Sequence, residues 1–399
     1  GEDQAKRQLF GTKAGLDLSD GVKIFGEYNN FLADIDIKTA NYKGGADMFV
    51  SEMAHFVDCI QNGTECRATP EDGIEVMKIL DAIYKSARGS RGYPLRNFNE
   101  RQAIIMKISV SSYSFAQYVG AGKMTQLDCV SKAKEMGFDA IEFTDIHGTD
   151  FDEQLENAKK LRAEAERVEI TINAYTIGAS LYSDDKAAMR AEVERLKGQL
   201  QIAAALGAGV MRHDVCYSLG KSGNARSFDL MLPTIAANAR EVTEYAQTLG
   251  IKTCTENHGY IAQDSDRVER LFNTVNHDNY GLLVDMGNFI CADENPITAV
   301  SRVAPYAVHA HVKDMIVRNT PTGGCQNMTR GGNYFCGCVV GEGDIPVRQC
   351  LRILKRAGYN GYISLEYEGA EDCIGGIARG LKNLKGFLAE EGIDSELTV

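Results

Sequence analysis

The 399-residue sequence predicts an α/β protein, a (β/α)8 TIM barrel preceded by a small α+β extension. Two observations predict this fold. From residue 106 onward, short apolar runs alternate with amphipathic stretches of helical period, which indicates parallel strands joined by helical crossovers. Eight such strand–helix units lie within residues 106–399, and this number fits a closed barrel better than an open sheet.

Each predicted barrel strand is a run of seven to nine mostly apolar residues bounded by polar or turn-forming residues. The strands are expected at 106–113, 139–145, 168–176, 209–216, 250–257, 280–286, 307–313 and 361–367. Amphipathic helices are expected between them, for example near 124–136, 186–206 and 231–249. No GxGxxG follows any of these strands, so the barrel region has no motif for a dinucleotide site.

The chain divides into three parts. Residues 1–90 form the extension, residues 91–105 a linker containing Gly, Pro, Asn and Arg, and residues 106–399 the barrel. The extension contains strand-like runs (GVKIFGEY and ADIDIKTAN), an apolar-faced helix near 46–62, and a second helix that begins at Thr69-Pro70. About 90 residues can hold only a marginal core of their own.

Composition restricts the classes of function. The net charge of −12 disfavours nucleic acid and anionic membranes as partners. No apolar run is long enough to span a membrane and no signal peptide is present, so a cytoplasmic location is expected. The eleven cysteines lack the spacing of a disulfide framework and are predicted to be reduced thiols. Cys325, Cys336 and Cys338 cluster in a Gly-rich stretch, where zinc binding is an alternative without a standard spacing.

Four residues carry the main functional prediction: Glu256, Asp285, His311 and Glu366. Each lies at the C-terminal end of a predicted strand, where barrel enzymes place their active sites. Three converging carboxylates repel one another and require a cation, so a metal is favoured over a buried ion-pair network. With one imidazole they suit one divalent cation, with Mn²⁺ first and Mg²⁺, Co²⁺ or Zn²⁺ as alternatives.

Neighbouring polar residues are candidates for substrate contact because side chains two apart on a strand share a face. His258 follows Glu256 by two residues and is expected to act as a base or a substrate contact. Lys313 is expected to neutralise a developing oxyanion or to hold Glu256, and Glu142 to meet substrate hydroxyls or Lys313. Tyr113 is a candidate wall of the pocket.

A second strand-end segment, VMRHDVCY, offers a further candidate. His213 is expected to contact substrate, and Arg212 beside it is expected to face the other way. His309, two residues before His311, is expected to pack deeper in the barrel.

The segments TENHG, LLVDMGN, HAHVKD, GEGDIP and YISLEYEG resemble the xylose-isomerase-like barrel superfamily, over residues 106–390. The superfamily includes sugar epimerases, hydroxypyruvate isomerase and inosose dehydratase. The resemblance implies that the four residues above bind the metal and that Glu256 and Glu366 exchange protons with substrate. Epimerases of this group often carry His three residues after the Asp, where this chain has Asn288, a candidate substrate contact that departs from their pattern.

Residues 1–90 resemble the C-terminal end of the Gfo/Idh/MocA oxidoreductases, in the segments LFGTKAGLDL and EMAHFVDCIQNGTECRATPEDGIEVMKILDAIYKSA. The nucleotide-binding half of that family would lie upstream of these residues. The resemblance therefore implies no NAD binding by this segment, and it is consistent with the remnant of a fusion or with a fragment of a longer chain.

The resulting functional prediction is a metal-dependent isomerase or epimerase that removes the proton next to the carbonyl of a keto-sugar, through an enediolate. One alternative is a dehydratase or lyase that expels a β-leaving group from a keto-sugar or 3-keto-glycoside. Another is a non-catalytic metal- or sugar-binding protein. The expected partner is a small carbohydrate, and a homo-oligomer is compatible with the sequence. Endonuclease IV shares the fold, but the low histidine count and the negative charge disfavour that function.

Overall fold

In the computed structural model, the described residues are 8–10, 14–17, 22–28, 31–37, 46–64, 66, 69, 105–219 and 227–393. The chain forms two compact units, Gly1–Arg101 and Gln102–Val399. The predicted linker 91–105 and the predicted helix from Thr69-Pro70 lie outside the described residues, apart from Thr69 and Ile105 themselves.

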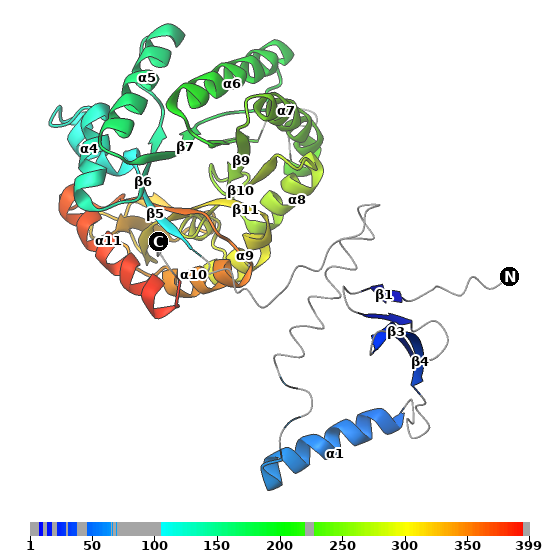
Figure 1. The fold of residues 1–399 in the computed structure, drawn as a ribbon. Helices are drawn as coiled ribbons and strands as arrows, with labels where there is room; N and C mark the ends of the chain where they lie inside the picture. Colours follow the sequence, from blue (N-terminus) through cyan, green and yellow to red (C-terminus); the bar gives the residue numbers. More distant parts are fainter. Residues whose placement is uncertain are drawn as a thin grey trace. The chain divides into compact units, whose positions relative to one another are not determined.

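The second unit is a closed barrel of eight parallel strands, which confirms the predicted fold (Figure 1). The strands in chain order are β5 (Lys107–Ser111), β6 (Ala140–Thr144), β7 (Thr171–Ile177), β8 (Val210–His213), β9 (Lys252–Glu256), β10 (Tyr280–Asp285), β11 (Ala307–Val312) and β15 (Tyr362–Leu365). The barrel closes where the first strand, β5, pairs in parallel with the last, β15. The four strands expected to carry the metal ligands, β9, β10, β11 and β15, are consecutive around the barrel.

Helices surround the strands as an outer ring (Figure 1). Their bounds are α3 (Ala116–Gly120), α4 (Gln126–Met136), α5 (Phe151–Arg167), α6 (Lys186–Leu206), α7 (Phe228–Thr248), α8 (Ser265–Val275), α9 (Pro296–Val303), α10 (Val347–Arg356) and α11 (Cys373–Glu390). Three short 3₁₀ segments are η1 (Ser112–Phe115), η3 (Asn288–Ala292) and η4 (Ala304–Tyr306).

Local sequence explains where these helices begin and end. In α4, the Thr125 side chain accepts a hydrogen bond from the backbone N–H of Asp128, whose carboxylate in turn accepts from the Thr125 N–H. Gly137 ends α4 in the left-handed conformation (φ 86°), which costs glycine little. Ser227 caps α7, so this helix begins three residues before the predicted start at 231.

The apolar core lies between the strands and the outer helices. Fully buried side chains from both layers, including Phe143, Leu196 and Leu200, pack there. The interior of the barrel contains polar groups in addition. Ser109 Oγ, for example, donates to Asn173 Oδ1 over 2.7 Å.

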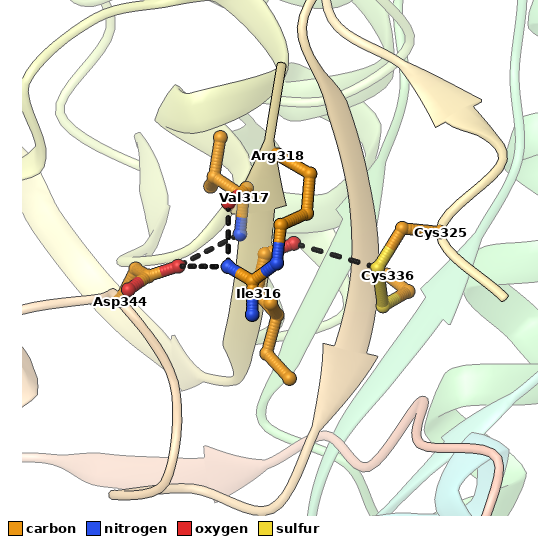
Figure 2. Close-up of a disulfide and its surroundings, with 6 residues drawn as sticks. All are labelled: Ile316, Val317, Arg318, Cys325, Cys336 and Asp344. Atoms are coloured by element: carbon orange, nitrogen blue, oxygen red, sulfur yellow. Dashed lines mark hydrogen bonds and ion pairs between the residues drawn. A yellow bond between two sulfur atoms is a disulfide. The ribbon is translucent and has the colours of Figure 1, made fainter. Parts of the chain in front are cut away.

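An antiparallel insert follows β11, made of β12 (Asp314–Arg318), β13 (Asn327–Met328) and β14 (Tyr334–Cys338). Figure 2 shows its disulfide between Cys325 and Cys336. The prediction that all cysteines are reduced thiols is therefore wrong for this pair, and Cys338 remains a free thiol. Sequence spacing did not reveal the bridge, because the pairing of β13 with β14 brings the two cysteines together.

The first unit contains the four-stranded antiparallel sheet β1 (Gln8–Phe10), β2 (Ala14–Asp17), β3 (Val22–Tyr28) and β4 (Phe31–Ile37), followed by helix α1 (Ala46–Asn62). The helix and the run GVKIFGEY were predicted at nearly the bounds of α1 and β3, whereas β4 begins two residues before the predicted run ADIDIKTAN. The apolar stripe expected on α1 includes Met53, Phe56 and Ile60, all of which are exposed. Within the described residues of both units, no helix combines the length and the apolar character needed to cross a membrane.

Candidate metal and substrate site

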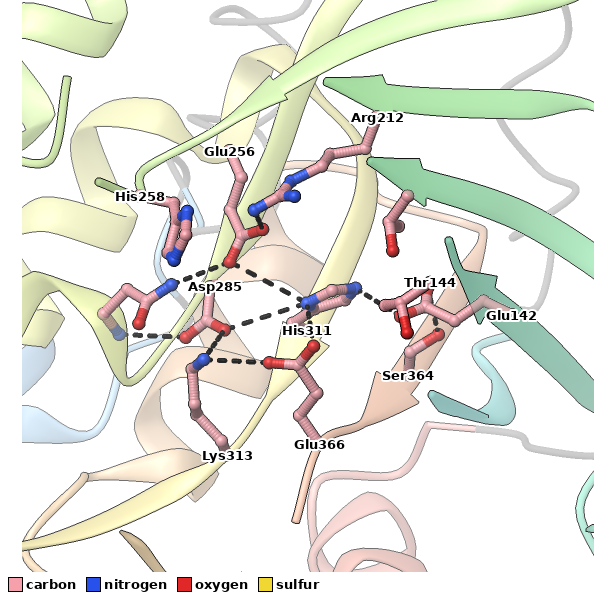
Figure 3. A network of polar contacts seen from close by, with 12 residues as sticks. Glu142, Thr144, Arg212, Glu256, His258, Asp285, His311, Lys313, Ser364 and Glu366 are labelled. Carbon is pink, nitrogen blue, oxygen red and sulfur yellow. Dashed lines mark hydrogen bonds and ion pairs between the residues drawn. The ribbon is translucent and has the colours of Figure 1, made fainter. Parts of the chain in front are cut away.

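The four predicted metal ligands meet at the C-terminal end of the barrel, and all four are buried (Figure 3). One potential ligand atom from each lies within 4.8 Å of the others: Glu256, Asp285, His311 and Glu366. His311 Nδ1 lies 3.5 Å from Glu366 Oε1 and 3.8 Å from both Glu256 Oε1 and Asp285 Oδ2. Neighbouring parallel strands in register explain the convergence, because Asp285 of β10 pairs directly with His311 of β11.

These residues fit a divalent cation. Asp285 Oδ2 and His311 Nδ1 are buried and have no hydrogen-bond partner among the described residues, although Lys313 Nζ lies 3.3 Å from that carboxylate oxygen. Burial raises the pKa of Asp285 to about 7; Lys313 opposes the shift, while the charges of Glu256 and Glu366 add to it. Three oxygen donors and one nitrogen donor suit a hard or borderline cation.

Asn288 and the backbone after β10 hold the ligands in place. Asn288 Nδ2 donates to Glu256 Oε1 over 2.7 Å. The backbone N–H groups of Gly287 and Asn288 both donate to Asp285 Oδ1, over 2.7 and 2.9 Å. Asn288 is buried and is not part of the cavity wall described below, so it positions a ligand and does not fit the expected substrate contact.

Glu142 lies beneath His311, where it is completely buried (Figure 3). Glu142 Oε1 lies 2.8 Å from His311 Nε2, and Oε2 lies 2.6 Å from His309 Nε2. Ser364 Oγ donates to the same Oε2 over 2.9 Å. A proton on His311 Nε2 that faces Glu142 leaves Nδ1 with its lone pair toward the other three ligands.

The prediction that Glu142 contacts substrate or Lys313 is therefore wrong. Its carboxylate faces His309 and His311, and it does not line the cavity. Glu142, His309 and His311 also form a group that could hold an ion. Glu142 Oε2 is occupied by contacts of 2.6 and 2.9 Å with His309 and Ser364. Glu142 Oε1 and His311 Nε2 lie 2.8 Å apart but outside hydrogen-bond geometry, so their contact is an ion pair.

The predicted orientations of Arg212 and His213 are reversed. Arg212 of β8 pairs in register with Cys254 of β9, two residues before Glu256, so both Arg212 and Glu256 face the interior. Arg212 Nη2 lies 2.5 Å from Glu256 Oε2 and 3.1 Å from Asp214 Oδ1. His213 is fully buried with its ring 6.4 Å from that of Tyr280, so it does not reach the substrate cavity.

His258 forms a pair with Asp214 at the rim of the site. Its Nδ1 lies 3.0 Å from Asp214 Oδ1, and Tyr217 Oη donates to Asp214 Oδ2 over 2.5 Å. Burial and the charge of Arg212 tend to lower the pKa of His258, but the hydrogen bond to Asp214 and the charges of Asp214 and Glu256 together outweigh them, so the pKa is raised. Asp214 was not among the predicted site residues, although its spacing of two residues from Arg212 on strand-forming sequence was a usable signal.

A cavity of about 310 Å³ opens above the four ligands. Five of the predicted site residues line it: Tyr113, Glu256, His258, Lys313 and Glu366. Lys313 Nζ donates to Glu366 Oε2 over 2.8 Å and to Glu368 Oε1 over 3.2 Å, so Lys313 holds Glu366 and not Glu256. Glu368 and Arg212 also line the cavity, and neither was among the predicted site residues.

Comparisons with known proteins agree with this architecture. A family model described as "Xylose isomerase-like TIM barrel" matches residues 130–390, and one described as "Oxidoreductase family, C-terminal alpha/beta domain" matches residues 34–95. The uncharacterized protein YihM of Escherichia coli is 24% identical over 249 residues, which are 62% of this chain and 67% of YihM. An inosose dehydratase of Clostridium perfringens is 22% identical over 138 residues, 34% of this chain. The chain spans 46%, about half, of that relative's length.

Solved structures share the fold at low identity. The IOLI protein with a bound zinc atom has a TM-score of 0.58 and 18% identity, over 72% of this chain and 99% of that protein. An L-ribulose 3-epimerase has a TM-score of 0.56 and 17% identity, over 72% of this chain and 96% of its own.

Proposed function

Since the chain belongs to the xylose isomerase-like TIM barrel family, we propose that it isomerises or epimerises a keto-sugar by removing the proton next to the carbonyl. One observation carries this proposal. Three carboxylates and one imidazole converge under an open, polar cavity, and two of the carboxylates reach its wall. This arrangement suits a divalent cation that a substrate also contacts.

Glu256, Asp285, His311 and Glu366 would hold the cation, with Mn²⁺ as the first candidate, and its positive charge would acidify the C–H bond next to the substrate carbonyl. The side chains of the chain supply the remaining functions. Lys313 and Arg212 line the cavity and add positive charge near the developing oxyanion. Glu256 and Glu366 enter from β9 and from the end of β15, so they are the proposed pair that removes and returns the proton (Figure 3).

The ion pairs of these two glutamates limit their basicity. Glu256 Oε2 faces Arg212, and Glu366 Oε2 faces Lys313. Burial would raise the pKa of Glu366, but the charges of Lys313 and His311 hold it well below its ordinary value. Because the two glutamates are weak bases, a third group that can take up or donate a proton would assist them. His258, which lines the cavity, is in position to do so.

Elimination is the second candidate, and the Asp214–His258 pair favours it. His258 lines the cavity, its side chain is 41% exposed, and Asp214 holds its Nδ1. An imidazole held in this way can donate its Nε2 proton to a β-leaving group. The match with inosose dehydratases is consistent with the same chemistry, although those enzymes are only 22–27% identical.

Proton exchange in D₂O tests both candidates. Metal-loaded protein incubated with keto-sugars should exchange one C–H next to the carbonyl, detected by NMR. Glu366→Gln should reduce the exchange rate by about 10²–10⁴-fold, the range typical of general acid–base groups. The metal content of the variant is measured in parallel. It should stay at the parent value, because the Gln side chain keeps an oxygen that can bind the cation.

His258→Asn separates the two candidates, with His277→Asn as a matched control away from the cavity lining. If the protein is an epimerase that uses two carboxylates, His258→Asn should raise KM more than it lowers kcat. If His258 acts in an elimination, kcat should collapse and no unsaturated product should form. Absence of exchange with every keto-sugar, together with an intact metal site, would contradict the proposal.

A further inference from the structure

We propose that the metal cavity continues into a second subsite that binds a further sugar ring or other neutral polyhydroxylated group, so that the preferred substrate is a keto-glycoside. This inference rests on the proposed function. A second cavity of about 220 Å³ lies between the segment after β5 and the segment after β6. Its lining residues are Ser112, Tyr113, Ala116, Val119, Gln126, Cys129, Thr144, Asp145 and His147.

The two cavities share part of their walls. Tyr113, Thr144 and Asp145 line both of them, so one ligand can contact these residues from either side. At about 310 Å³, the metal cavity alone lies near the lower end of the ~300–1,000 Å³ range of small-molecule sites. A ligand larger than a monosaccharide would extend past the shared residues into the second cavity.

Asp145 is the strongest single observation at this junction. Its backbone is left-handed (φ 41°), which is uncommon for a residue other than glycine and tends to occur at functional sites. Two contacts hold this conformation: the Asp145 N–H donates to Thr176 O over 3.2 Å, and Gln126 Nε2 donates to Asp145 O over 2.8 Å. The charges of Arg195, Arg212 and His147 act on the Asp145 carboxylate, but among the described residues none forms a hydrogen bond or an ion pair with it, so both oxygens can accept from ligand hydroxyls.

Tyr113 supplies the complementary apolar surface. It is 48% exposed, and the chain has no Trp, so a Tyr ring is the kind of side chain left for stacking on a sugar face. Ala116, Val119 and Cys129 add apolar surface to the second cavity, and Ser112 and Thr144 add hydroxyls. An apolar face beside hydrogen-bonding groups matches the two kinds of surface that a sugar ring presents.

Charge distinguishes this ligand from a phosphate. No Lys or Arg lines the second cavity; its titratable members are Asp145, which would repel an anion, and His147. The positive groups of the site, Arg212 and Lys313, line only the metal cavity and are already paired with carboxylates. The second cavity therefore favours a neutral, hydroxylated group over a phosphorylated one.

The test compares 3-keto-glucose with a 3-keto-disaccharide, using metal-loaded full-length protein and proton exchange in D₂O. The parent should show a kcat/KM for the disaccharide at least about tenfold higher, which corresponds to one or two additional hydrogen bonds. Ala116→Phe fills the second cavity, so the disaccharide-to-monosaccharide ratio should fall by about tenfold. Asp145→Asn tolerates the left-handed backbone and should lower the ratio by about threefold.

Ala121→Phe is the matched control. Ala121 is an exposed residue that follows α3 and does not line the cavity, so the ratio should stay at the parent value. Equal kcat/KM values for the two substrates in the parent, or an unchanged ratio in Ala116→Phe, would overturn the subsite.

A binding measurement keeps the test independent of turnover. Calorimetry with the unoxidised disaccharide trehalose and with glucose should show tighter binding of trehalose, lost in Ala116→Phe. If the parent exchanges no keto-sugar, the proposed reaction fails, and the trehalose result alone then supports or refutes the subsite.

Discussion

Replacement of Glu142 by Gln should weaken metal binding without unfolding the barrel. Glu142 does not touch the cation position, but its Oε1 lies 2.8 Å from His311 Nε2. The Gln side chain keeps the shape and can keep an oxygen toward His311, with its amide toward His309 and Ser364. The substitution therefore removes the negative charge that fixes His311 with Nδ1 free for the metal.

One charge-assisted hydrogen bond sets an upper bound on the effect, because Glu142 Oε1 and His311 Nε2 lie 2.8 Å apart but outside hydrogen-bond geometry. Hydrogen bonds to a charged group contribute about 1.5–3 kcal/mol and neutral ones about 0.5–1.5 kcal/mol. Their difference of about 1–1.5 kcal/mol corresponds to roughly a tenfold loss of metal affinity. This value lies at the low end of the ~10–100-fold losses seen when residues behind metal ligands are changed.

Calorimetric titration of EDTA-stripped protein with Mn²⁺ and Zn²⁺ measures the loss, with circular dichroism to confirm the fold. Ser364→Ala is the control, because it removes a neutral hydrogen bond to Glu142 but leaves the contact with His311. The metal affinity of Ser364→Ala should fall by less than about threefold. A folded Glu142→Gln variant with the affinity of the parent would refute the assigned role.

Three further predictions concern stability and covalent state. Burial raises the pKa of Asp285 to about 7, so in metal-free protein its protonated form is favoured by folding, and stability falls as pH rises from about 4 to about 7. In urea denaturation with EDTA, the free energy of unfolding of Asp285→Asn should rise relative to that of the parent by about 1.4 kcal/mol per pH unit over that window. A difference that does not change with pH would contradict the raised pKa of Asp285. Thiol titration of denatured, unreduced protein should find nine free thiols of eleven, because Cys325 and Cys336 are paired; eleven would show that no bridge forms. Residues 102–399 should fold alone with a cooperative transition, and an insoluble product would show that the first unit supports the barrel.

The barrel and the ligand set were predictable because both depend on local pattern. Alternation along a strand sets which side chains share a face, and the C-terminal edge of a parallel sheet brings separate strand ends together. Glu256, Asp285, His311 and Glu366 needed no further information. The prediction that His309 packs deeper in the barrel is confirmed. His309 lies two residues before His311 on the same face of β11 and is buried.

Register around the barrel was not predictable in the same way. Whether Arg212 or His213 faces the interior depends on how β8 aligns with β9, and one residue of shift exchanges the two faces. Glu142 faces the interior as expected, but its carboxylate contacts His309 and His311 and does not line the cavity. The disulfide depends on the fold of a Gly-rich insert, for which the sequence offers no periodicity.

The insert is fixed to the barrel at its base, and its tip contacts the loops after β9 and β10 through Arg330 and Thr329. Its first and last residues, Asp314 and Cys338, are paired with each other, so the chain leaves and re-enters the barrel at adjacent points. The Asp314 carboxylate also accepts hydrogen bonds from the backbone N–H groups of Gly341, Gly343 and Ile345, within the GEGDIP segment that follows. A segment of different length exchanged between Met315 and Gly337 would keep the hydrogen bonds at Asp314, but it would lose the contacts of Thr329 with Asp293 and of Arg330 with Asp264. Such an exchange would give protein engineers a way to reshape the rim of the barrel without changing its strands.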